Sequence, residues 1–140
     1  MKWLAIAFAL FLTVPAFAQT KDGPSTPMTP TPDDRAKQWL ILLDDQNYAD
    51  AYGQMGAVVR DKAGSDDWTR KVSALRAPLG AMSARNLKDV KLTKTVPGLH
   101  NGQYAVVRYD STFAHKAAAV ETVTLVSEKG AWAVVSYSVN

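Results

Sequence analysis

VETVTLVSEKGAWAVVSYSV, residues 120–139, is the stretch that decides the fold. Apolar and polar residues alternate on both sides of Lys129-Gly130, and alternation with a period of two is typical of strands that bury one face. The Lys129-Gly130 pair predicts a tight turn at this point. We therefore expect residues 120–126 and 131–139 to form an antiparallel hairpin.

Two more strands are predicted before this hairpin. Residues 103–113 alternate in the same way. Residues 84–96 mix apolar side chains with lysines, a composition typical of an edge strand that carries protective charge. Because Asn101-Gly102 supplies a turn signal between them, the four strands together predict an antiparallel meander.

Ahead of the strands, the apolar residues follow the period of a helix. Three amphipathic stripes begin near Ala36, Tyr48 and Trp68, and Asp33-Asp34 is the predicted cap of the first. Helices grouped before strands favour an α+β fold. We expect three N-terminal helices packed on a curved four-stranded antiparallel meander.

The N-terminal end predicts a secretory signal peptide over residues 1–18. Lys2 precedes an apolar run of about a dozen residues, and Ala-Phe-Ala at residues 16–18 has the small-x-small pattern of a cleavage site. A membrane anchor is the alternative, but a span needs about 20 apolar residues. Cleavage would leave a disordered Pro/Thr-rich leader, residues 19–32, and a single α+β domain, residues 33–140.

Charge and cysteine content narrow the possible partners and locations. Removal of Lys2 lowers the formal charge from +3 to +2, and no run of Lys and Arg suggests a nucleic-acid partner. The chain has no cysteine, which excludes disulfides, thiolate metal sites and a lipidated N-terminal cysteine. We expect a soluble periplasmic protein without an integral membrane segment after cleavage; secretion is the alternative location.

A set of mostly aromatic, charged and glycine residues is spread over residues 36–139. Its members are Trp39-Leu40, Asp44, Tyr48, Tyr52, Trp68, Arg76–Gly80, Arg85, Gly102–Tyr104, Thr112-Phe113, Glu121–Val123, Gly130–Trp132 and Tyr137. Together they resemble the DUF4019 family, small exported bacterial proteins of unknown function. This resemblance favours the periplasm and implies no activity or catalytic residues. The order of helices and strands also resembles cystatin-like and NTF2-like folds, a likeness of architecture alone.

Glu121 is the main candidate functional residue. In a regular strand its side chain shares the core-facing side with Val123, where a carboxylate is costly unless it is paired. Arg76 and Arg85 are the expected partners, and Arg108 is a less favoured one. Two interpretations stay open: these four residues bind a small ligand in a pocket, or they form a structural ion pair. A bulge before Val123 would instead turn Glu121 outward.

The sequence contains no motif for a catalytic site, a cofactor or a metal. Serine-hydrolase, nucleotide-binding and zincin motifs are absent, and His100 and His115 lack carboxylates at ligand spacing. We expect a non-enzymatic binding or interaction module whose partner is an envelope protein or a small ligand. The alternative is a pocket protein or cryptic enzyme centred on Glu121.

A homodimer through a second sheet face is also predicted. That face would carry Val106, Thr122, Thr124, Trp132 and Val134.

Overall fold

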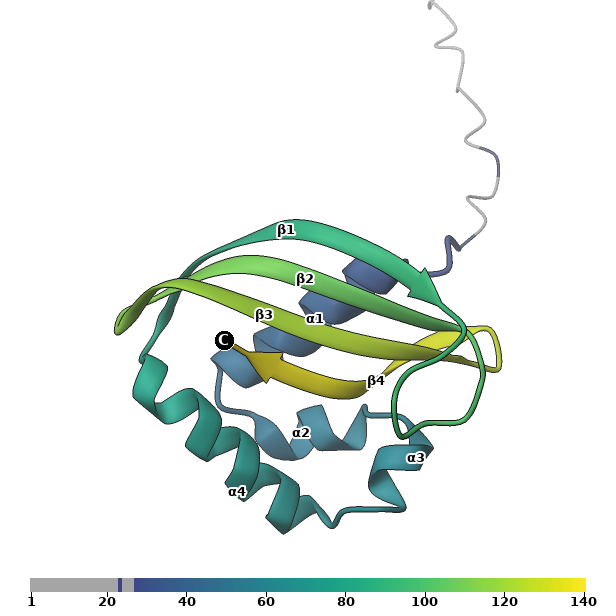
Figure 1. Cartoon of the computed structure of the whole chain (residues 1–140), viewed down its shortest axis with the longest axis horizontal. Coiled ribbons are helices and arrows are strands. Elements are labelled where there is room, and N and C mark those ends of the chain that lie inside the picture. The colour runs from purple at the N-terminus through teal and green to yellow at the C-terminus, as the bar shows by residue number, and fades with distance from the viewer. Residues whose placement is uncertain (1–22, 24–26) are drawn as a thin grey trace, which may run out of the picture.

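The computed structural model describes residue 23 and residues 27–140. The predicted signal peptide, and residues 19–22 and 24–26 of the predicted leader, lie outside this part of the chain. The described residues form helices followed by a four-stranded antiparallel sheet, which confirms the predicted α+β class (Figure 1). The elements are α1 (Pro32–Asp44), α2 (Tyr48–Gly53), α3 (Ala57–Arg60), α4 (Ser65–Arg76), the 3₁₀ helix η1 (Ala77–Leu79), β1 (Met82–Thr93), β2 (Tyr104–Phe113), β3 (Lys116–Glu128) and β4 (Ala131–Val139).

The sheet is the predicted meander, with its strands in the order β1-β2-β3-β4. Lys129 and Gly130 adopt φ angles of 50° and 79°, which is the left-handed backbone that a two-residue hairpin turn requires. The predicted tight turn is therefore confirmed. β3 begins at Lys116, earlier than the alternation predicts, and joins β2 through the short Ala114-His115 turn.

The predicted number of helices is wrong, because the second amphipathic stripe forms two short helices instead of one. Between α2 and α3, Met55 makes an isolated bridge to Val134 of β4. The Gly56 N–H donates to the carbonyl of Val134 at 2.8 Å. A Cβ atom on Gly56 would lie 3.1 Å from the Val135 side chain, so glycine permits this close approach. The contact with β4 takes backbone groups that a continuous helix would use internally.

The cap of α1 also differs from the prediction, since the N-cap is Thr31 and not Asp33-Asp34. The Thr31 side chain accepts from the Asp34 N–H at 3.1 Å, and the Asp34 carboxylate accepts from the Thr31 N–H at 3.0 Å. This reciprocal pair is a capping box. Asp33 instead accepts from the Tyr109 hydroxyl on β2 at 2.7 Å, and so it joins the start of α1 to the sheet.

The core lies between the sheet and the helices, and Trp39 of α1 is its largest fully buried side chain. The indole of Trp39 packs against Trp68 and Tyr137, with ring centroids 6.1 and 5.8 Å away. Its N–H donates to the Ala51 carbonyl at 2.9 Å, so the one polar atom of this ring is satisfied. Trp39 therefore links α1 to α2, α4 and β4.

The second sheet face differs in composition from the prediction. The pairing of β3 with β4 shifts between Thr124 and Leu125, which places Leu125 opposite Val134 and leaves Val135 as the extra residue. This bulge reverses the alternation along β4. Val134 consequently has no exposed surface and Trp132 packs against the core, so neither belongs to the outer face.

Candidate functional site

Glu121 points into the core, as the alternation predicts. Its side chain has no exposed surface, and neither does that of Val123 on the same strand. The pairs Tyr109–Glu121 and Val107–Val123 follow one another without a shift, so no bulge turns Glu121 outward. The sequence therefore places a carboxylate among fully buried apolar side chains.

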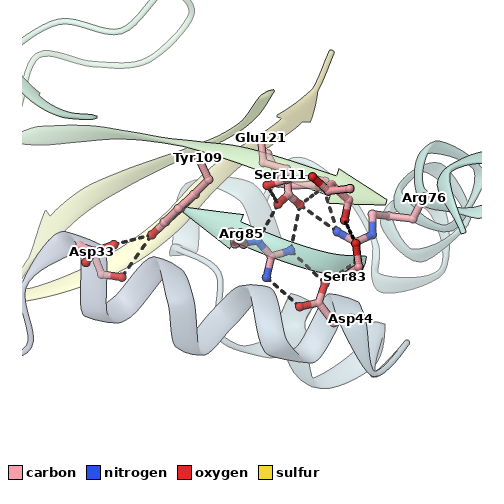
Figure 2. A network of polar contacts seen from close by, with 10 residues as sticks. Asp33, Asp44, Arg76, Ser83, Arg85, Tyr109, Ser111 and Glu121 are labelled. Carbon is pink, nitrogen blue, oxygen red and sulfur yellow. Dashed lines mark hydrogen bonds and ion pairs between the residues drawn. The ribbon is translucent and has the colours of Figure 1, made fainter. Parts of the chain in front are cut away.

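Hydrogen-bond donors surround the Glu121 carboxylate (Figure 2). Oε1 accepts from Arg76 Nη1 at 2.9 Å, from Tyr137 at 2.7 Å and from Arg85 Nη2 at 3.1 Å. Oε2 accepts from Arg85 Nε at 2.6 Å and from Ser111 at 2.6 Å. These donors supply the compensation that a buried carboxylate needs. The predicted contacts of Glu121 with Arg76 and Arg85 are confirmed.

Asp44, at the end of α1, is the second carboxylate of this network. Its two oxygens accept from Arg85 Nη1 and Nη2 at 2.7 and 2.9 Å, and Oδ1 also accepts from Arg76 Nη2 at 2.5 Å. Arg85 thus lies between two carboxylates and is bidentate to each. We call Asp44, Arg76, Arg85, Ser111, Glu121 and Tyr137 the Glu121 cluster. It joins two helices to all four strands.

Local structure explains how the two arginines meet. Arg76 is the last residue of α4, and its guanidinium lies 4.9 Å from the centroid of the Phe113 ring. Gly80, with a φ of 74°, then turns the chain from η1 toward β1. Arg85 lies opposite Ser111 in the β1–β2 pairing, on the side of the sheet that the helices cover. The guanidinium of Arg76 therefore reaches Glu121 from the end of α4, and that of Arg85 reaches it from β1.

The surroundings shift the pKa values of several cluster residues. Burial by itself raises the pKa of Asp44, but the hydrogen bonds from Arg85 and Arg76 outweigh it and hold that pKa below its ordinary value. Burial raises the pKa of the Tyr137 hydroxyl far above its usual range, and the charge of Glu121 adds to the effect. Asp44 is consequently an anion near neutral pH, and Tyr137 remains a neutral donor.

Acid should weaken the fold through Asp44. A carboxyl whose pKa is lower in the folded state contributes stability above its unfolded pKa, about 3.9, and loses it as the pH falls through the folded value. We expect Asp44→Asn to have a lower free energy of unfolding than the original chain at pH 6. This difference in unfolding free energy should be smaller at pH 3. Guanidinium unfolding followed by tryptophan fluorescence measures this difference. Asp61→Asn, a change at an exposed position, is the control, and equal gaps at both pH values would contradict the expectation.

A cavity of about 270 Å³ lies beside the cluster and opens to solvent. Asp44 and Arg76 are its charged lining residues, whereas Glu121 does not reach it. A molecule in this cavity would therefore meet two charges that already neutralise one another. The other lining residues are Leu43, Gln46, Tyr48, Ser73, Ala77, Gly80, Ala81 and Met82.

Arg108 does not join the cluster. It pairs with Asp89 on the exposed side of the sheet, where its Nε lies 2.8 Å from the carboxylate.

Sequence reasoning about Glu121 missed Asp44, Ser111 and Tyr137 as its cluster neighbours. The signals were present, because Asp44 and Tyr137 are among the residues that carry the family resemblance and Ser111 is a polar residue on the buried face of β2. Ligand binding by the predicted residues stays a prediction.

The described residues contain no group of three or more His, Cys, Asp or Glu side chains placed to hold a metal ion. Both carboxylates of the Glu121 cluster accept from arginine instead.

None of the helices in the described part of the chain is both long and apolar enough to cross a membrane.

Comparison with known proteins agrees with the resemblance seen in the sequence. A family model described as "Protein of unknown function (DUF4019)" matches residues 35–137, which is most of the chain. The search of curated proteins finds no match.

Proposed function

The chain belongs to the DUF4019 family, and from that premise we propose that it is an exported, non-enzymatic interaction module of the bacterial cell envelope. The observation that carries this proposal is the exposure of apolar side chains on β1. Leu87, Val90 and Leu92 are 45%, 41% and 68% exposed. Apolar residues gathered on one exposed strand favour contact with another protein.

The position of β1 in the sheet supports the same proposal. β1 is the first strand in the order, so one of its edges has no strand beside it within the described residues. The outer edge of β4, by contrast, is contacted at Met55 and Gly56. An uncovered edge offers backbone donors and acceptors to an added strand.

The Glu121 cluster gives less support to a catalytic or ligand-binding role. A general base must reach a substrate proton directly or through one water molecule. Glu121 has no exposed surface, and both of its oxygens accept hydrogen bonds from other residues of the chain. We therefore propose that the Glu121 cluster stabilises the fold and that β1 makes the contact with the partner protein.

Location in the periplasm is part of the proposal, and the predicted signal peptide supports it. Cleavage of the signal peptide would leave a mature chain that starts near Gln19. In the periplasm, this mature chain would be able to contact other envelope proteins. The likeness to cystatin-like and NTF2-like folds stays a prediction and is not needed for this proposal.

Photo-crosslinking in living cells tests the proposed function. A photoreactive residue in place of Leu92 should form protein adducts in the periplasmic fraction, because this side chain is on the exposed strand. The same replacement at Arg70, an exposed position on α4, should form few or none. Absence of adducts from Leu92, or equal adducts from both positions, would contradict the role of β1.

A further inference from the structure

β1 contains a bulge that places two opposite charges side by side. Its pairing with β2 shifts between Leu87 and Asp89, which leaves Lys88 as the extra residue. Lys88 and Asp89 both lie on the sheet face away from the helices. There Lys88 contacts the carboxylate of Asp110 at 3.2 Å, and Asp89 pairs with Arg108. Without the bulge, two adjacent residues would point to opposite faces.

The apolar residues on either side of the bulge point to the other face. Leu87 lies opposite Tyr109, and Val90 lies opposite Val107. Tyr109 and Val107 have no exposed surface and face the helices. Leu87 and Val90 are only partly covered, so β1 presents apolar groups on one face and a Lys-Asp pair on the other.

We propose that the partner of β1 is a second copy of this chain, paired antiparallel about a two-fold axis between Lys88 and Asp89. This proposal rests on the proposed function and names its partner. In this arrangement Lys88 of each copy faces Asp89 of the other. Leu87 of each copy faces Val90 of the other on the helix side. Opposite charges and apolar groups directly across two strands both stabilise the pairing.

The bulge is what makes this register possible. In a regular strand, adjacent residues cannot face each other across a two-fold axis, because they lie on opposite faces. Here Lys88 and Asp89 share a face, so the axis can pass between them. An axis through Lys88 would place lysine against lysine, and an axis through Asp89 would place aspartate against aspartate. Lysines often protect an edge strand from pairing. In the proposed register, the lysine charge instead meets a carboxylate.

Charge reversal tests the register. Lys88→Glu alone and Asp89→Lys alone each put like charges together in both central pairs. A one-to-one mixture of the two variants restores opposite charges in both pairs. We expect the original chain to dimerise, each variant to dissociate with a dissociation constant at least about tenfold higher, and the mixture to dimerise again. Sedimentation velocity measures all four samples, and circular dichroism checks that the variants are folded.

Cysteine crosslinking gives a second measurement of the same register. The chain has no cysteine, so each introduced thiol is the only one in its molecule. Leu87→Cys mixed with Val90→Cys should form a disulfide dimer on mild oxidation, because directly opposed residues lie within disulfide reach. Each variant alone should form much less. Equal yields alone and mixed would overturn the register.

The outcomes separate this proposal from the proposed function. A strict monomer at the highest soluble concentration, or charge variants that dimerise like the original chain, would overturn the pairing of two copies. Adducts from Leu92 with the mass of a different protein, together with a monomeric chain, would overturn the second copy and leave the interaction role standing. Adducts at twice the chain mass support both.

Discussion

Glu121→Ala is expected to lower the free energy of unfolding by about 3–5 kcal/mol, which is the usual effect of removing one partner from a buried ion pair. The change leaves Arg76 and Arg85, which are 6% and 9% exposed, with Asp44 as the one carboxylate partner that remains to them among the described residues. It also leaves the hydroxyls of Ser111 and Tyr137 without their acceptor. Small domains are stable by about 5–15 kcal/mol, so the variant loses a large share of its stability. Urea unfolding followed by tryptophan fluorescence measures the loss.

Two further variants identify the cause of this loss. Glu121→Gln keeps the size and one acceptor oxygen but removes the charge, so its stability should fall between those of the original chain and the alanine variant. Asp67→Ala, which breaks an exposed ion pair with Arg70, should cost at most about 1 kcal/mol. An alanine variant at Glu121 as stable as the original chain would contradict the structural role and favour the ligand-binding interpretation.

The sheet and the orientation of Glu121 follow from local pattern. Alternation with a period of two assigns each residue of a strand to a face, and this holds for Glu121 because β3 pairs with β2 without a shift there. The partners then follow from electrostatics, since a buried carboxylate needs cations and Arg76 and Arg85 lie near the junction of helices and sheet. These inferences need no knowledge of distant contacts.

Other features depend on contacts between distant parts of the chain. The break between α2 and α3 arises where Met55 and Gly56 meet Val134. Gly53 and Gly56 indicate a weakened helix or a close approach at this point, but the local sequence does not indicate which segment approaches. The bulge in β4 leaves no trace in the pattern, because Val134 and Val135 are both apolar. A polar residue such as Asp44 is common at the end of a helix, so its presence there does not by itself indicate a role in a site. Its role in the Glu121 cluster appears only when the elements are assembled.

Gly80→Ala is the second change with a large expected effect. Gly80 adopts φ 74° and ψ −162°, a backbone conformation that is open essentially to glycine alone. A Cβ atom there would also lie 2.7 Å from His115 Cδ2 and 3.0 Å from the Ala114 Cβ. Forced backbone conformations of this kind cost about 1–3 kcal/mol, and we expect a loss of unfolding free energy in that range. Guanidinium unfolding at neutral pH measures it.

Gly53→Ala is the matched control for Gly80→Ala. Gly53 is the last residue of α2, and a Cβ atom added there meets nothing within 4 Å. Alanine should therefore leave stability unchanged or raise it by about 0.4–1 kcal/mol, because it restricts the unfolded chain. Equal effects of the two glycine changes would show that the turn before β1 is not constrained.

A second variant separates backbone strain from steric overlap at Gly80. His115 is exposed, so its ring can turn aside, and His115→Ala removes it altogether. If overlap with the ring caused the loss, Gly80→Ala would cost little in the His115→Ala background. We expect most of the loss to persist there, because φ at Gly80 is set by the path from Arg76 to Arg85 and not by the ring. The same turn that excludes a side chain at Gly80 thus brings two arginines to one buried carboxylate.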